Sequence, residues 1–199
     1  MNPYNVVKDF ESALCEYTGA KYAVTTNSCT NALLLACAYK TAKTKIKVVD
    51  IPSKTYVGVA QSLLHAGFLM TFNEEEWSGQ YELYPLKVYD CARRFTSGMY
   101  VNNQYQCVSF QASKILGDTQ GGAILHDYDE ADKWFRKARF DGRTEGVDPK
   151  DDNFILGYHC YMSPDVAARL LLKLYSLPKH NEDLPNDDYP DLSLQSVFK

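Results

Sequence analysis

The chain has 199 residues, of which 45% are hydrophobic and 23% are charged, and its net charge at pH 7 is −4. This composition excludes a disordered polymer and is sufficient for a buried core. The acidic balance argues against a nucleic-acid partner or an anionic membrane surface, because both select basic proteins. The sequence has neither a run of roughly 20 apolar residues, as a membrane span requires, nor a basic start followed by an apolar stretch, so we expect a cytoplasmic protein.

The six cysteines and four histidines are scattered along the sequence. They form no C-x-x-C pair and no H-E-x-x-H motif, so the clustered ligands of a zinc centre are missing and we expect no metal. A secreted disulfide framework is usually shorter and denser in cysteine. The cysteine pattern therefore agrees with a reducing compartment.

Helices and strands alternate through the first part of the chain. Residues 5–18 place apolar side chains at helical spacing and end at Gly19, which predicts a helix. Pro52 and Gly67 mark the ends of later elements. Helices are predicted at 5–18, 30–39 and 56–66, and strands at 21–26, 46–51 and 68–72.

The second part continues this alternation and ends in an acidic segment. Strands are predicted at 86–89, 105–110 and 122–126, and a helix at 129–140. Ser163-Pro164-Asp165 is typical of a helix start and opens a last helix. We interpret residues 1–177 as one compact domain and residues 178–199 as an extended tail. Four apolar side chains of the tail are candidates for docking on a partner: Leu192, Leu194, Val197 and Phe198.

Strands that alternate with helices predict an α/β fold, with a mainly parallel central sheet and helices on both faces. In such sheets the ligand binds beyond the carboxyl ends of the strands. Candidate functional residues are therefore sought directly after the predicted strands.

The first candidate segment lies where the strand at 21–26 runs into the helix at 30–39. Backbone amides at a helix N-terminus, with the hydroxyls of Ser28 and Thr30 on either side of Cys29, form a cup for a phosphate group. The alternative is an ordinary helix cap without a ligand.

Two further strand ends carry charged side chains. Asp90 follows the strand at 86–89, where a carboxylate points into the crevice and needs a partner; the alternative is a turn residue or an ion pair with Arg93 or Arg94. Lys114 follows the strand at 105–110 and has glycine turns after it, which suits an amine nucleophile. The alternative for Lys114 is a solvated surface charge.

The three candidates together indicate a cofactor site. A phosphate cup comes first, then an acid, then a lysine 24 residues after the acid. Pyridoxal phosphate (PLP) needs an anchor for its phosphate, a carboxylate that keeps its pyridine nitrogen protonated and an amine that holds its aldehyde. The order of the candidates is the order found in PLP sites.

At this point the sequence resembles the DegT-type family of PLP-dependent nucleotide-sugar aminotransferases. The resemblance covers roughly residues 5–175, and the lysine motif is its most specific part. The segments that carry it are 10–36 (FESALCEYTGAKYAVTTNSCTNALLLA), 52–57 (PSKTYV), 88–92 (VYDCA), 109–114 (SFQASK) with 121–123 (GGA), and 157–162 (GYHCYM). The resemblance implies the large domain of the fold type I, aspartate aminotransferase-like transferases.

The resemblance also implies roles for individual residues. Lys114 would hold the aldehyde of the cofactor and move a proton, and Asp90 would pair with the pyridinium nitrogen. Tyr56 would stack on the ring. The other implied contacts are the Cys29 and Thr30 amides with Ser28 and Ser109 at the phosphate, Gln111 lining the site, Arg93 near the ring oxygen, and His159 from the partner subunit.

The activity implied by the resemblance is an amino-group transfer in nucleotide-sugar biosynthesis. The donor is an amino acid, typically glutamate, and the acceptor is a keto group on a nucleotide-linked sugar. Members of the family are homodimers, and each of their active sites borrows residues from the other subunit. The resemblance therefore implies a homodimer with shared active sites.

Departures from the family pattern leave other outcomes open. The chain is roughly half of the usual length, so we expect a shortened member that lacks most of the C-terminal small domain, and residues 73–85 are too few for the usual extra strand and helix. Cys29 stands in place of Gly, Arg93 in place of Gln or His, His159 in place of Asn and Tyr161 in place of Arg. The alternatives are a degenerate homologue that binds PLP or a sugar nucleotide without transaminase activity, and a PLP dehydratase or racemase.

Overall fold

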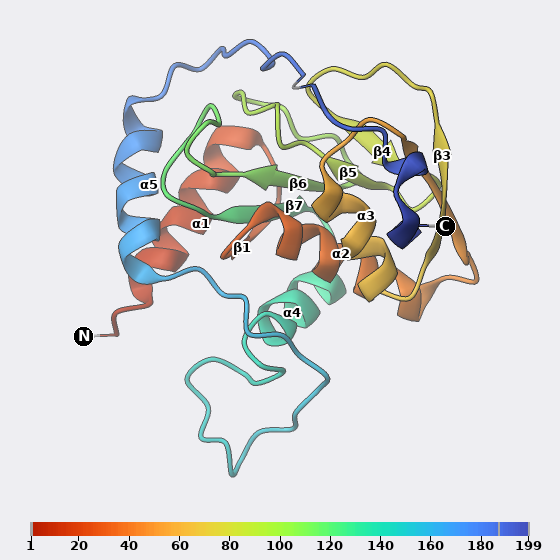
Figure 1. The fold of residues 1–199 in the computed structure, drawn as a ribbon. Coiled ribbons are helices and arrows are strands. Elements are labelled where there is room, and N and C mark those ends of the chain that lie inside the picture. The colour runs from red at the N-terminus through yellow and green to blue at the C-terminus, as the bar shows by residue number, and fades with distance from the viewer. Residues whose placement is uncertain (1, 187, 199) are drawn as a thin grey trace.

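The computed structural model describes residues 2–186 and 188–198. Its centre is a five-stranded sheet, and a two-stranded parallel ladder continues it (Figure 1). The strands of the sheet lie in the order β1 (Tyr22–Thr26), β7 (Gly122–His126), β6 (Tyr105–Ser109), β5 (Val88–Asp90) and β4 (Tyr81–Leu83). The ladder consists of β2 (Val48–Pro52) and β3 (Leu69–Asn73). Paired hydrogen bonds between Asp50 and Tyr84, of 2.9 and 3.1 Å, connect the ladder to the β4 side of the sheet.

The five-stranded sheet is mixed, so the prediction of a mainly parallel sheet is wrong. Within the described chain, β5 and β6 form its one parallel pair, and the other three pairings are antiparallel. Parallel neighbours need a long crossover, usually through a helix. Residues 84–87 are too few for a crossover between β4 and β5, and residues 110–121 join β6 to β7 without a helix.

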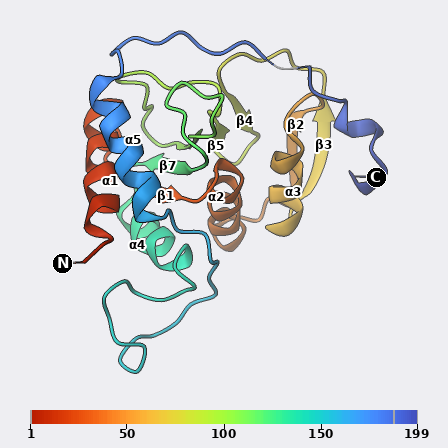
Figure 2. The same ribbon diagram turned by 60° about the vertical axis from the view of Figure 1, so that its left-hand side comes forward.

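Helices cover both faces of the sheet, as predicted (Figure 2). On one face α1 (Asn5–Thr18) packs against α5 (Pro164–Ser176), and on the other lie α2 (Cys29–Lys43) and α4 (Asp129–Ala138). The remaining α-helix, α3 (Val57–His65), packs on α2 and on the ladder. Each described helix is too short or too polar to cross a membrane.

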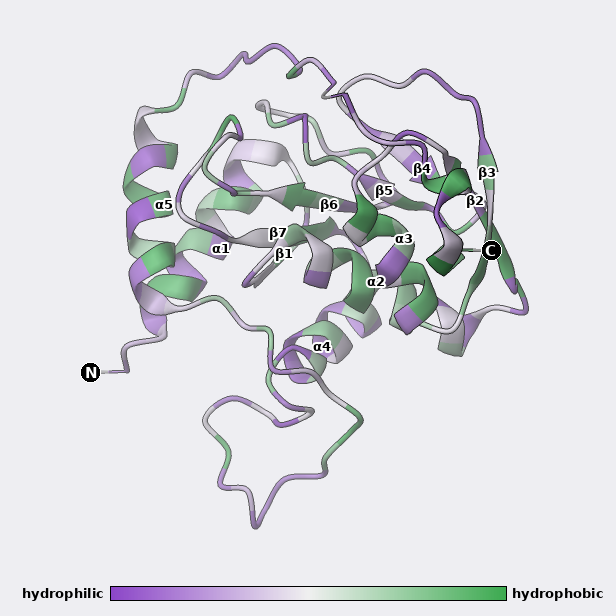
Figure 3. Cartoon of the chain, in the orientation of Figure 1, coloured by the Kyte–Doolittle hydropathy of each residue, from purple (hydrophilic) through white to green (hydrophobic). Residues whose placement is uncertain are grey.

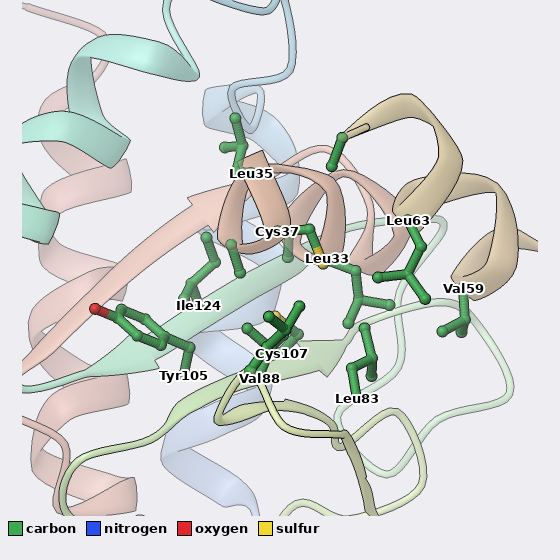
Figure 4. Packing of buried hydrophobic residues seen from close by; sticks show 14 of the residues in the cluster. Leu33, Leu35, Cys37, Val59, Leu63, Leu83, Val88, Tyr105, Cys107 and Ile124 are labelled. Atoms are coloured by element: carbon green, nitrogen blue, oxygen red, sulfur yellow. The ribbon is translucent and has the colours of Figure 1, made fainter. Parts of the chain in front are cut away.

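The sheet separates two hydrophobic cores because neighbouring side chains on a strand point to opposite faces. On β7, Ala123 and Leu125 pack toward α1 and α5, whereas Ile124 packs toward α2. Figure 4 shows the core between the sheet and α2, where Leu63 of α3 packs at one side of this core. The hydropathy colouring of Figure 3 shows that α4 and α5 each carry both polar and hydrophobic residues, as expected of helices with one face on the sheet.

Two other segments differ from the predictions. Residues 73–85 include a strand, β4, although the described residues 74–80 contain no helix. In the C-terminal segment, residues 178–186 and 188–191 are extended, and two short 3-10 helices follow, Leu192–Leu194 and Ser196–Phe198. Leu192 is buried in the core, so its predicted docking on a partner is wrong, while Leu194 and Val197 are exposed.

A buried carboxylate joins α1, β1 and α4. Glu11 accepts hydrogen bonds from the amide of Thr25 (2.9 Å), from Arg136 Nη1 (2.6 Å) and from Arg139 Nη1. Burial alone would raise the pKa of Glu11, but the charges of Arg139 and Arg136 and the Thr25 amide outweigh it and lower the pKa from 4.5 to about 2. The ionised form is therefore the one that the fold stabilises.

We predict that Glu11→Gln weakens the fold and makes it less sensitive to acid. Because the pKa of Glu11 is lower in the folded state, its contribution is complete above pH 4.5 and is lost as the pH falls toward 2. Its size is about 3 kcal/mol, so the variant should lose about this free energy of unfolding at pH 7 and differ less from the wild type at pH 3. Urea unfolding at both pH values measures this.

The control is Glu16→Gln, on the exposed side of the same helix. This substitution should change the free energy of unfolding by less than about 0.5 kcal/mol at either pH. Equal losses for Glu11→Gln at pH 7 and pH 3 would contradict the assignment.

Candidate active site

A cavity of about 470 Å³ lies at the end of β5 and β6, beside the start of α2. It gathers eight of the ten residues singled out from the sequence: Ser28, Cys29, Thr30, Tyr56, Asp90, Ser109, Gln111 and Lys114. These residues come from four separate parts of the chain, and the fold brings them together. The other two, Arg93 and His159, do not line the cavity.

The start of α2 forms one wall of the cavity. Ser28 is the N-cap residue, and its hydroxyl accepts a hydrogen bond from the amide of Asn31 (3.2 Å). The first amides of a helix have no acceptor within the helix, so those of this turn are available to an anion. The Cys29 thiol donates to the Cys107 carbonyl (3.6 Å), so the side chain is turned toward β6 while the backbone stays at the cavity.

A close backbone contact holds this turn beside the lysine loop. Ser28 forms a bridge with Gly121, and a Cβ atom on Gly122 would lie 2.5 Å from the backbone nitrogen of Cys29. Only glycine allows so close an approach. The Gly121-Gly122 pair of the lysine motif is therefore required for the cavity to form.

Asp90, the last residue of β5, lies in the floor of the cavity and is only 4% exposed. Its Oδ1 accepts from the Ala92 amide (2.9 Å) and its Oδ2 from the Tyr81 hydroxyl (3.2 Å). Burial raises the pKa of Asp90, and these hydrogen bonds together with the charges of Lys114 and Arg93 only partly oppose that effect. An acid in this state gains from a further cationic partner.

Lys114 lies on the loop between β6 and β7, is half-buried and lines the same cavity. The loop is closed at its base by a hydrogen bond from the Phe110 amide to the Gly121 carbonyl (2.9 Å). A second bond, from the Lys114 amide to the Gln111 carbonyl (2.8 Å), fixes the turn. The Lys114 ammonium is near enough to Asp90 to lower the pKa of its carboxyl group.

Aromatic side chains surround the mouth of the cavity, and two of them were not found from the sequence. Tyr56 was predicted and is 54% exposed. Trp77 and Tyr189 also line the cavity, and their rings stack with their centroids 6.3 Å apart. Trp77 lies within residues 73–85, which were expected to be too few for the usual extra strand and helix. Its one signal in the sequence was an aromatic residue in a polar loop. Tyr189 carried no local signal because its contact with the site is long-range.

Arg93 holds the C-terminal segment against the site. The guanidinium group is buried and donates to the carbonyl of Pro185 and to the hydroxyl of Tyr189 (3.2 Å). The neighbouring Arg94 makes a two-point ion pair with Asp183 (2.6 and 2.9 Å). Arg93 does not line the cavity, and the contact implied for it, with the ring oxygen of a cofactor, stays a prediction.

His159 is exposed, and its Nδ1 lies 3.1 Å from the carboxylate of Asp141. It follows the loop 141–158, which projects away from the sheet (Figure 1). The contact implied for His159 is with the cofactor of a partner subunit, and it stays a prediction.

Comparison with known proteins supports the resemblance to this family. Residues 1–79 match the model of the DegT/DnrJ/EryC1/StrS aminotransferase family. A Campylobacter jejuni protein named UDP-4-amino-4,6-dideoxy-N-acetyl-beta-L-altrosamine transaminase is 25% identical over 88% of this chain and 57% of its own length. The resemblance predicted from the motifs is therefore confirmed.

Solved structures confirm the fold. Helicobacter pylori PseC, described as an aminotransferase involved in pseudoaminic acid biosynthesis, matches with a TM-score of 0.73 and 20% identity over 87% of this chain and 58% of that one. The sugar aminotransferase CalS13 from Micromonospora echinospora matches with a TM-score of 0.71 and 16% identity over 86% and 60% of the two chains. The architecture is that of the fold type I transferases, and the chain spans 57–60% of the length of these three relatives.

We predict that Arg94→Ala loosens the C-terminal segment without unfolding the domain. A half-buried, two-point ion pair of this kind contributes about 1 kcal/mol, so its loss should raise the locally open population about five-fold. Limited proteolysis read by mass spectrometry should then show faster cleavage between residues 181 and 189.

Arg169→Ala is the matched control, because Arg169 pairs with Asp118 and Asp165 instead of with the C-terminal segment. Cleavage at 181–189 should stay at the wild-type rate in this variant. If Arg94→Ala also stays at that rate, the ion pair does not hold the segment.

Proposed function

We propose that the chain is a PLP-dependent aminotransferase that moves an amino group from an amino acid, typically glutamate, to a keto group on a nucleotide-linked sugar. One observation carries the proposal: a helix start, a buried acid and a lysine line one cavity although they are distant in the sequence. The family match over residues 1–79 and the name of the Campylobacter jejuni relative support the same reaction.

The residues present fit the cofactor. Asp90 is a buried acid whose pKa is raised by burial, so a positively charged ring nitrogen would stabilise its ionised form. The first turn of α2 offers amides and the Ser28 hydroxyl to a phosphate group, and Ser109 lines the same cavity. PLP, when bound, supplies an aldehyde that takes up the amine and a ring that accepts electrons.

Each side chain then has a definite task. Asp90 binds the protonated ring nitrogen and keeps that proton in place. Lys114 presents its Nζ as the nucleophile, and afterwards carries a proton on the same atom. Tyr56, at the edge of the cavity, covers a face of the ring and limits the access of water.

The assembly we propose is a homodimer with shared sites, acting in the cytoplasm. The loop 141–158 projects from the body of the chain, and its most exposed apolar side chains are Phe154 and Leu156, which are 59% and 84% exposed. Such side chains on a projecting loop suit contact with a second subunit. All six cysteines, which lie in the described part of the chain, are free thiols, and this supports a reducing compartment.

Lys114→Ala tests the activity. Purified with PLP, the wild-type chain should retain the cofactor through desalting and absorb visible light, and Lys114→Ala should lack that absorption band. Added glutamate should change the wild-type spectrum and release 2-oxoglutarate. Lys114→Ala should release 2-oxoglutarate from glutamate about 10²- to 10⁴-fold more slowly than the wild type, because it lacks the group that moves the proton.

The control for this test is Lys133→Ala, an exposed lysine on α4, which should behave as the wild type does. Identical spectra for the wild type and Lys114→Ala would overturn the assignment of the lysine. A wild-type chain that binds PLP but does not respond to glutamate would favour the homologue without transaminase activity.

The double substitution Phe154→Ser and Leu156→Ser tests the assembly. If the loop contacts a second subunit, polar side chains there should weaken the dimer by at least about 10-fold, since each buried apolar side chain contributes 1.5–3 kcal/mol. Sedimentation velocity over a concentration series measures this. The matched control is Leu172→Ser, which changes an exposed leucine on α5; an equal effect of the control would contradict a specific role of the loop.

A further inference from the structure

The strand that the sequence did not predict brings a tyrosine to the acid of the site. In the antiparallel pairing of β4 with β5, Tyr81 is directly opposite Asp90. Residues that face each other across such a pair project to the same side of the sheet. The Tyr81 side chain is 3% exposed, and its hydroxyl donates to Asp90 Oδ2 at 3.2 Å.

A second hydroxyl, that of Thr55, extends this hydrogen bond into a chain. The Oγ1 atom of Thr55 lies 2.5 Å from the Tyr81 hydroxyl, and Thr55 is buried as well. The single hydroxyl proton of Tyr81 goes to Asp90, so the Thr55 hydroxyl donates to the Tyr81 oxygen. The three groups form a chain from Thr55 through Tyr81 to Asp90, and hydrogen bonds in such a chain strengthen one another.

The surroundings of Asp90 make this neutral donor important. Lys114 and Arg93 act on the carboxylate by charge, and the Ala92 amide binds Oδ1. Among the described residues, the other titratable neighbours are thiols, whose pKa values burial raises well above the usual range, so they stay neutral: Cys29, Cys91 and Cys107. The Tyr81 hydroxyl is a neutral donor that binds Oδ2 directly.

We propose that Tyr81 is a positioning residue, which holds the Asp90 carboxylate ionised and turned so that it can bind the ring nitrogen of the cofactor. The proposal rests on the function proposed above, because the ring nitrogen belongs to PLP. Thr55 supports Tyr81 in this role.

Tyr81→Phe removes the hydroxyl and keeps the ring. The ring packs against Trp77 at a centroid distance of 4.7 Å, and this contact survives the substitution. Tyr89→Phe is the matched control: Tyr89 lies on β5 next to Asp90, and its hydroxyl donates to Glu82 (3.0 Å). Thr55→Val removes the second hydroxyl and should give a weaker version of the Tyr81→Phe effect.

The first measurement needs no cofactor. Carbon-13 NMR of the aspartate carboxyl groups, with Asp90 assigned by its absence in Asp90→Asn, follows the titration of Asp90. Loss of one hydrogen bond to the charged form should raise the pKa of Asp90 by about one unit in Tyr81→Phe. Tyr89→Phe should leave it unchanged. An unchanged Asp90 titration in Tyr81→Phe would overturn the inference.

The second measurement is the affinity for PLP, from fluorescence quenching by the cofactor, together with the pH dependence of its visible absorption. A carboxylate that is ionised less often and held less firmly binds the ring nitrogen more weakly, so Tyr81→Phe should bind PLP more weakly than the wild type, by up to about 10-fold at pH values where Asp90 is largely protonated. Wild-type affinity in Tyr81→Phe would also overturn the inference. A wild-type chain that does not bind PLP would refute the proposed function, and the NMR titration would still decide whether Tyr81 holds the carboxylate.

Discussion

The cavity depends on keeping one carboxylate, that of Asp90, out of water. An ionised acid in a protein interior is unfavourable unless donors and positive charges surround it. The structure places an amide, a hydroxyl and two cations around Asp90, yet burial still dominates and its pKa stays raised. The site is thus built around an acid that is only partly satisfied, and a cationic group entering the cavity completes its environment.

The elements around Asp90 follow from this requirement. The short strand β4 brings the Tyr81 hydroxyl to one oxygen, and the turn after β5 brings the Ala92 amide to the other. The C-terminal segment, held by Arg93, closes the side of the cavity where Tyr189 stacks on Trp77. A segment distant in the sequence from the cofactor motifs therefore forms part of the wall.

The sequence predicted those parts of the site that have a local signature. Asp90 ends β5 and Lys114 lies on the loop that follows β6, and the Gly121-Gly122 pair marks the close approach of that loop to the start of α2. The mixed sheet and Tyr81 were missed, because strand direction and pairing depend on long-range contacts that a three-residue strand does not reveal. Tyr189 was missed for the same reason.

A comparison of the two buried acids separates a structural role from a functional one. Glu11 has two arginines of its own, and its pKa is lowered to about 2, so its charge is balanced within the fold. Asp90 is equally buried, but its pKa is raised, and it lies in a cavity with a lysine. Both acids are almost fully buried in the same chain, so the difference between their pKa shifts arises from their neighbours. The fold uses the charge of Glu11 to join its elements, whereas the charge of Asp90 is only partly balanced, which is the pattern of the ligand-binding acid that we propose.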